Sequence, residues 1–170
     1  MRNYSDLIDK LNLIPHPEGG YYRRNWQSLL SADIKDSSAR TLFTGRTIGS
    51  SILYLLPSIE VSTWHRTSCD EMWHHYSGSP LVLYSLNAQK SLSQQILGSD
   101  IDAGQLPQII MHRGNWFAAE TVEPDSYTLC GCTLWPAFTY SDFELADIAK
   151  LIDEYPQYKA EIEHIAKRSK

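Results

Sequence analysis

The central part of the chain, from residue 21 to about residue 135, is a succession of short apolar runs separated by turn residues. These runs are rich in β-branched and aromatic residues, which favour strands. Turn pairs such as Pro57-Ser58 and Gly78-Ser79 lie between them. Many short strands without intervening helices are typical of a β-sandwich or barrel. The predicted strands are residues 21–27, 51–56, 61–65, 71–77, 80–86, 92–97, 108–111, 115–120 and 127–135.

Helical patterns occur only near the two ends of the chain. Residues 4–13 place Leu7, Ile8 and Leu11 at helical spacing, and two prolines follow. A second apolar periodicity begins after Ser141 or Asp142, and a last helix follows Pro156. Residues 28–50 are expected to be a longer loop with one edge strand. We therefore predict one domain over residues 1–170, with an all-β core at about 20–136 and C-terminal helices at about 142–168.

The charge balance excludes several classes of partner. The 170 residues include 15 Lys and Arg and 20 Asp and Glu, which gives a formal net charge of −5. Nucleic-acid binders and proteins of anionic membrane surfaces need a basic face, so neither partner is expected. No run approaches the ~18 apolar residues of a membrane span, and the N-terminus has no apolar run typical of a signal peptide. A cytoplasmic location is expected.

The three cysteines do not predict a disulfide framework. Their number is odd in a chain without a secretion signal. Cys130 and Cys132 would share one face of a strand, and their spacing differs from that of CxxC redox or zinc motifs. We interpret both as buried, reduced core residues.

Histidines and aromatic residues gather in the segment from Trp64 to Gly78. If residues 71–77 form a strand, its alternation places Glu71, Trp73 and His75 on one face. His75 therefore shares a face with Glu71, and the adjacent His74 does not. Aromatic residues here would either line a binding cavity or fill the core.

This segment resembles the first motif of the cupin superfamily. The resemblance rests on His65-x-Thr67-x-x-x-Glu71 with Gly78 after it, and a later stretch, residues 112–117, resembles the second motif. Further stretches are similar to the cupin_5 group, formerly a domain of unknown function. These are Pro15-His16-Pro17-Glu18-Gly19-Gly20-Tyr21-Tyr22-Arg23, Ser51-Ile52-Leu53-Tyr54-Leu55-Leu56, Glu71-Met72-Trp73-His74, Gly114-Asn115-Trp116-Phe117-Ala118-Ala119-Glu120 and Phe143-Glu144-Leu145-Ala146-Asp147. The resemblance implies a cupin double-stranded β-helix (jelly roll) with a short N-terminal helix and C-terminal helices, enclosing a ligand site. It also implies a homodimer.

The resemblance places this chain apart from the metal-binding cupins. Those proteins hold a metal ion with three histidines and one glutamate, and the matching positions are His65, Thr67, Glu71 and Phe117. Threonine is a poor ligand for a transition metal and phenylalanine is none. We therefore expect no metal cofactor; a divalent transition metal at His65 and Glu71 would need a further ligand, for which His75 and Glu120 are the candidates.

Metal-free members of the superfamily include sugar-nucleotide epimerases, which use a histidine base backed by a carboxylate and a tyrosine acid. That chemistry needs a base that titrates near neutral pH and an acid across the substrate. Burial would raise the pKa of Glu71, whereas a neighbouring histidine or arginine would hold it ionised. Equally, His65 and Glu71 would satisfy one another inside a small barrel without any catalytic role. The predicted catalytic residues are His65, Glu71, His75 and Tyr84, and the predicted ligand-binding residues are Tyr22, Arg23, Trp73, Trp116, Phe117 and Glu120.

Three hypotheses of function follow. The first is a metal-independent, small-molecule-binding cupin that acts as an epimerase or isomerase on a carbohydrate-type substrate. The second is a non-catalytic module that binds or senses a ligand in the same cavity. The third is a metal-dependent cupin with an irregular set of ligands.

Overall fold

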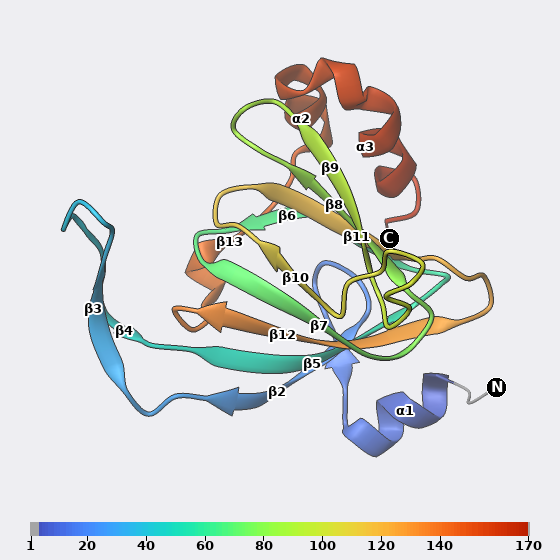
Figure 1. Cartoon of the computed structure of the whole chain (residues 1–170), viewed down its shortest axis with the longest axis horizontal. Helices are drawn as coiled ribbons and strands as arrows, with labels where there is room; N and C mark the ends of the chain where they lie inside the picture. The colour runs from blue at the N-terminus through green and yellow to red at the C-terminus, as the bar shows by residue number, and fades with distance from the viewer. Residues whose placement is uncertain (1–3, 170) are drawn as a thin grey trace.

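The structure, a computed structural model, describes residues 4–169 and consists mainly of two packed antiparallel sheets (Figure 1). The first sheet has the order β1-β2-β5-β12-β7-β10. Its strands are β1 (Ile14–Pro15), β2 (Tyr21–Gln27), β5 (Ser50–Pro57), β12 (Tyr127–Trp135), β7 (Asp70–Gly78) and β10 (Gln108–Met111). The second sheet has the order β13-β6-β11-β8-β9. Its strands are β13 (Phe143–Leu145), β6 (Val61–Thr67), β11 (Trp116–Thr121), β8 (Leu81–Leu86) and β9 (Leu92–Leu97).

Successive strands alternate between the two sheets from β5 to β8 and again from β9 to β13, which is the connectivity of a jelly roll. A short helix, α1 (Tyr4–Leu11), precedes the sheets, and two helices, α2 (Ile148–Glu154) and α3 (Lys159–Ala166), follow them. The predicted jelly roll with an N-terminal helix and C-terminal helices is confirmed. Among the described residues, none of the helices has the length and apolarity that crossing a membrane requires.

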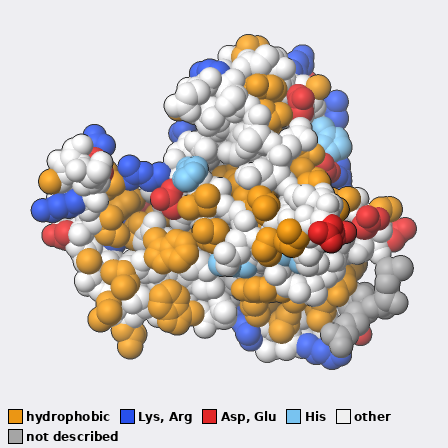
Figure 2. All heavy atoms as spheres, viewed as in Figure 1, with side chains coloured by type: hydrophobic (Ala, Val, Ile, Leu, Met, Phe, Trp, Pro, Cys, Tyr) orange, Lys and Arg blue, Asp and Glu red, His pale blue; other side chains and the backbone are white. Residues whose placement is uncertain are grey.

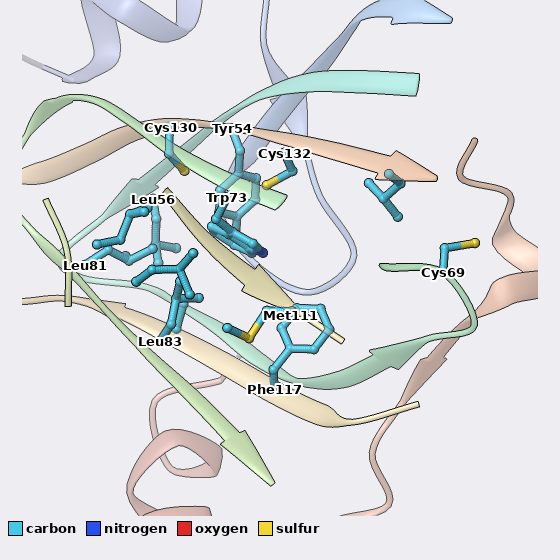
Figure 3. Close-up of a cluster of buried hydrophobic side chains, with 14 residues drawn as sticks. Tyr54, Leu56, Cys69, Trp73, Leu81, Leu83, Met111, Phe117, Cys130 and Cys132 are labelled. Atoms are coloured by element: carbon cyan, nitrogen blue, oxygen red, sulfur yellow. The ribbon is translucent and has the colours of Figure 1, made fainter. Parts of the chain in front are cut away.

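The main core lies between the two sheets. Figure 3 shows side chains of both sheets meeting around Trp73, with Tyr54 and Cys132 from the first sheet and Leu83 and Phe117 from the second. Apolar burial of this kind supplies most of the favourable free energy of folding. Cys69, Cys130 and Cys132 are buried free thiols, and the sequence predicts this state for Cys130 and Cys132.

A second core lies on the outer face of the second sheet, beneath α2 and α3 (Figure 1). Trp64 is fully buried there, and its indole N–H donates to the carbonyl of Ile162 on α3 at 3.3 Å. Trp116 and Ala118 face this helical layer, whereas Phe117 and Ala119 face the core between the sheets. Alternation along β11 therefore divides its side chains between two different cores.

The region 28–50 differs from its prediction as a loop with one edge strand. It forms an additional hairpin, β3 (Ser31–Lys35) and β4 (Thr41–Thr47), which projects from the body as an arm (Figure 1). Its many polar, exposed residues hide the strand pattern, because neither face of the arm is fully buried.

The C-terminal helices also begin later than predicted. Residues 143–145 pair with β6 as an edge strand, and α2 starts only at Ile148. The side chain of Asp147 caps α2 by accepting from the backbone N–H of Lys150. An apolar residue such as Leu145 fits both a helical and a strand pattern, and pairing with β6 makes residues 143–145 a strand.

Candidate functional site

A cavity with about 500 Å³ of empty space, including the part open to solvent, lies between the sheets at the end where β13 joins β6. Its polar lining comes from both sheets and from the turn between β1 and β2. This combination of apolar walls and a few converging polar groups is typical of a small-molecule site. The lining residues are His16, Glu18, Tyr22, Arg24, Ile52, His65, Thr67, Glu71, Cys132, Leu134, Phe138, Tyr140 and Phe143.

Glu18 is the centre of the polar cluster, and the turn at residues 16–20 holds it in place. Its side chain is only 7% exposed. One carboxylate oxygen accepts from the hydroxyl of Ser62 at 2.9 Å, and the other lies 3.1 Å from Nε2 of His65. The carbonyl of Glu18 also accepts from the N–H of Thr63, so the turn is attached to β6 at both backbone and side chain.

His65 shares a proton with Glu18. Its Nδ1 lies 2.7 Å from the carbonyl oxygen of Thr63, which only accepts, so Nδ1 carries a proton. Its Nε2 faces the Glu18 carboxyl, and that contact is attractive only with a proton between the two atoms. The ring also contacts Phe117, with 4.1 Å between the ring centroids. Both nitrogens of His65 are therefore engaged by the protein.

His16 lies on the other side of Glu18. Its Nδ1 is 3.5 Å from the Glu18 carboxylate and 3.4 Å from the Glu18 backbone N–H. The ring packs edge-on against Tyr22 at 4.6 Å between centroids. Burial lowers the pKa of His16 more than the charge of Glu18 raises it, so this imidazole is neutral at neutral pH.

Glu71 is a buried acid at the β7 side of the cavity. Burial, with a smaller contribution from Glu18, raises its pKa from the usual 4.5 to about 8, although a hydrogen bond from Cys132 lowers it. Glu71 is therefore mostly protonated at neutral pH and can donate a proton. The two carboxyl groups of the cavity thus differ in their partners: within the part of the chain that the structure describes, Glu18 is paired with histidines and Glu71 is not.

The raised pKa of Glu71 predicts a pH dependence of stability. Between about pH 4.5 and pH 8 the folded protein binds more protons at this group than the unfolded chain does. Its contribution to stability is complete at low pH and is lost as the pH rises through this window. We expect Glu71→Gln, which stays neutral, to flatten the fall in urea midpoint across this window. The exposed Glu144→Gln is the control and should keep the slope of the wild type; parallel slopes for all three proteins would contradict the assignment.

Aromatic residues surround the mouth of the cavity. The hydroxyls of Tyr22 and Tyr140 lie 3.2 Å apart, and Phe138 and Phe143 pack close to them. The segment that carries these rings is fixed by Asp142. Burial opposes ionisation of Asp142, but hydrogen bonds from Arg46, Thr139 and Ser68 hold its pKa below the usual value. The base of the arm and the turn before β7 are thereby tied to the cavity mouth.

Of the predicted site residues, the structure brings His65, Glu71 and Tyr22 together in this cavity. Phe117 and Trp73 lie behind its wall in the core and touch one another edge-on. Two other predicted residues lie outside the lining.

His75 lies at a β-bulge of β7, with Nε2 3.4 Å from the carbonyl of Ser79. Arg23 points to the opposite face of β2 from Tyr22 and Arg24, so Arg24 is the arginine at the cavity.

The remaining predicted residues, Tyr84, Trp116 and Glu120, lie on the outer face of the second sheet. The hydroxyl of Tyr84 donates to Glu120 at 2.6 Å, and this carboxylate also contacts His164 at 3.0 Å and Arg168. We give the name helix clamp to Tyr84, Glu120, His164 and Arg168, because they join β8 and β11 to the end of α3. The side chain of His164 is 51% exposed and belongs to this ion-pair network through Glu120.

Two central residues of the cluster, His16 and Glu18, were not among the predicted site residues. Both belong to the segment Pro15–Arg23, which resembles the cupin_5 group, and this resemblance is the sequence feature that could have identified them. A buried glutamate beside a double-glycine turn reaches His65 only because the turn packs on β6.

The donor set does not fit a transition metal. Thr67 directs its hydroxyl to the carbonyl of Cys69 at 2.7 Å, and Phe117 has no donor atom. Nε2 of His65 is already directed to Glu18. Among residues 4–169, no three His, Cys, Asp or Glu side chains are arranged to hold a metal ion.

Comparison with known families gives one match that covers most of the chain. The family described as "Cupin_5: Cupin superfamily (DUF985)" matches residues 5–146. A comparison with curated proteins found no match.

Solved structures include two that are similar over almost the whole chain. A protein from Shewanella oneidensis is 36% identical, with a TM-score of 0.85, and the match covers 100% of this chain and 99% of that one. A hypothetical protein from Leishmania major is 27% identical, with a TM-score of 0.84, over 96% of this chain and 98% of that one. Oxalate decarboxylase from Bacillus subtilis is 9% identical with a TM-score of 0.55, over 89% of this chain and 36% of that one, a similarity of fold alone.

Proposed function

Because this chain belongs to the Cupin_5 family of the cupin superfamily, we propose that it binds a small molecule in its barrel cavity and transfers a proton on it without a metal. The reaction class is that of an epimerase or isomerase, and the substrate class is carbohydrate-type. One observation carries this proposal: two histidines and two carboxyl groups line a single cavity, and burial raises the pKa of one of these carboxyl groups, Glu71, to about 8.

The cluster supports proton transfer because it combines proton acceptors with a neutral acid. The Glu18 carboxyl group contacts both histidines, whereas Glu71 has a raised pKa and no histidine partner among residues 4–169. General acid–base catalysis needs these two kinds of group on either side of a substrate. The tyrosines and Arg24 at the same cavity offer hydrogen bonds to hydroxyl or anionic groups of a sugar derivative.

Solvent-exchange measurements test the proposal. Keto sugars and sugar nucleotides are incubated in D₂O with EDTA-treated protein, and deuterium at carbon is followed by ¹H NMR. We expect exchange in at least one compound and a roughly hundredfold slower rate for Glu18→Gln, which removes the charge shared by both histidines. The exposed Glu144→Gln should match the wild type. No exchange in any compound, or exchange that requires added metal, contradicts the proposal.

A specific observation favours the second candidate, a non-catalytic binding module. Both nitrogens of His65 are occupied by Thr63 and Glu18, as expected of a histidine that only stabilises the cavity. A compound that raises the melting temperature but is recovered without deuterium would support this candidate.

We also propose a homodimer. Hydrophobic side chains are exposed on the face from which the arm projects (Figure 2), and Trp26, Leu29, Leu30 and Trp135 are among the exposed apolar residues. Trp26 and Trp135 both lie beside Gly49, at the base of the arm. Exposed apolar patches of this kind often mark protein–protein contacts. Light scattering should give twice the chain mass of 19.4 kDa; a monomeric mass would contradict the proposal.

A further inference from the structure

Resting on the proposed proton transfer, we propose that His16 is the residue that accepts the substrate proton, and that His65 is a positioning residue that holds Glu18. The substrate class is an α-hydroxycarbonyl compound, which carries an acidic proton on the carbon beside a carbonyl group. His16 comes from the turn between β1 and β2 rather than from the strands that carry His65 and Glu71.

The two histidines differ in which nitrogen is free. His65 uses Nδ1 for the Thr63 carbonyl and Nε2 for Glu18. The side chain of His65 is 2% exposed and that of His16 is 8% exposed, and Nε2 of His65 would have to leave the Glu18 carboxylate before it could take a substrate proton. His16 directs only Nδ1 towards Glu18, and its Nε2 has no hydrogen bond to any residue between 4 and 169. This ring lines the cavity. Among the described residues of the cluster, its Nε2 is therefore the imidazole nitrogen that no hydrogen bond occupies.

The contacts of His16 suit both protonation states. The neutral ring can accept at Nδ1 from the Glu18 N–H, or donate from Nδ1 to the Glu18 carboxylate and leave Nε2 unprotonated. After Nε2 takes a proton, Nδ1–H faces the carboxylate at 3.5 Å. Burial keeps His16 neutral before the reaction, and Glu18 stabilises the positive charge that forms.

His65 helps to hold the Glu18 carboxylate beside His16. The 3.1 Å contact with His65 and the 2.9 Å hydrogen bond from Ser62 fix both carboxylate oxygens. Without them, the buried carboxylate would keep only the longer 3.5 Å contact with His16, and burying a carboxylate with so few partners is costly. His65 therefore acts through Glu18 and need not touch the substrate.

Glu71 provides the matching acid. His16 lies at the β1 edge of the first sheet and Glu71 on β7, with β2, β5 and β12 between them, and both line the same cavity. Nε2 of His16 takes the proton from the carbon beside the carbonyl, and the electron pair of that C–H bond forms a carbon–carbon double bond. The carbonyl oxygen takes the carboxyl proton of Glu71, which gives an enediol. Return of a proton to a carbon completes the epimerisation or isomerisation, and Glu71 recovers its proton from the enediol oxygen.

Chemical modification of the wild-type protein gives a first test that needs no substrate. Diethyl pyrocarbonate acylates imidazole nitrogens that are unprotonated and reachable, and peptide mass mapping identifies the modified residue. We expect His16 to react and His65 to be spared, with the exposed His112 as the positive control. Acylation of His65 with His16 spared would overturn the inference.

Exchange with dihydroxyacetone, the smallest symmetric α-hydroxycarbonyl ketone, gives the second test. We expect deuterium incorporation to fall roughly a hundredfold from the wild type to His16→Asn, and less in His65→Asn. The rate should be partly restored in His65→Gln, because the longer side chain places its amide N–H closer to the position of Nε2, from which it can donate to Glu18. His112→Asn should equal the wild type. Urea midpoints confirm that each variant is folded, and His16→Gln replaces His16→Asn if that variant unfolds.

The two proposals fail in different ways. Exchange that survives in His16→Asn and disappears in His65→Asn overturns the inference but leaves the proposed function standing. Exchange of sugar derivatives without exchange of dihydroxyacetone overturns the substrate class. Absence of exchange from every compound removes the proposed function and, with it, the role of His16.

Discussion

Replacing Gly19 by alanine is expected to destabilise the protein by about 3 kcal/mol or more, from combined backbone strain and overpacking. Gly19 has a φ of +110°, a region that side chains other than glycine rarely adopt. A Cβ atom there would lie 2.1 Å from the carbonyl oxygen of Val61. That oxygen belongs to the backbone of β6 and cannot move without disturbing the strand. Urea unfolding of the variant and the wild type measures the effect.

The same change should disrupt the cavity, because Gly19 follows Glu18 directly. The carbonyl of Gly19 accepts from the hydroxyl of Tyr54 at 2.8 Å, and its N–H donates to the carbonyl of His16. Gly45→Ala on the arm is a matched control, since Gly45 also has a positive φ, +60°, but a Cβ atom added there would meet no atom within 4 Å. We expect Gly45→Ala to cost about 1 kcal/mol. Equal losses in the two variants would contradict the role of the Val61 contact.

Removal of the Glu120 carboxylate is expected to destabilise the protein by about 2–4 kcal/mol, because it leaves the buried hydroxyl of Tyr84 and the partly buried guanidinium of Arg168 without this acceptor. Glu120 is 12% exposed and accepts from Tyr84 and Arg168, with His164 at 3.0 Å. In Glu120→Ala the hydroxyl of Tyr84 and the guanidinium of Arg168 both lose this partner. The end of α3 should therefore detach from β11 at lower urea concentration, as measured by circular dichroism.

The control for the Glu120→Ala variant is the loss of a solvent-exposed ion pair, Glu154 with Lys90. Glu154→Ala removes the contact with Lys90; both side chains are about half exposed, so its cost should be under about 1 kcal/mol. Glu120→Ala should also leave solvent exchange in the cavity unchanged below the unfolding transition. A large loss of exchange rate in folded Glu120→Ala would instead favour the predicted catalytic role of Tyr84 and the predicted ligand-binding role of Glu120.

Part of the cavity could be predicted from the sequence because motif spacing identifies residues of neighbouring strands. His65 and Glu71 lie on β6 and β7, which are joined by a tight turn, so both reach the same space. Tyr22 was predicted from a segment of the resembled family, and it also lines the cavity. Alternation within a strand correctly separates two faces, but it does not say which layer covers each face. That limit accounts for Trp116 and Glu120, which face the helices instead of the cavity.

The sequence by itself determined the all-β core and the helices at both ends, because these depend on periodicity along the chain, and the resemblance to the first cupin motif singled out His65 and Glu71. Only the tertiary structure decided that His16 and Glu18 complete the cluster. They lie more than forty residues before His65 in the sequence and reach it through a glycine turn that packs against the backbone of β6. Such a contact depends on the close approach of two backbones, and no local pattern of side chains encodes it.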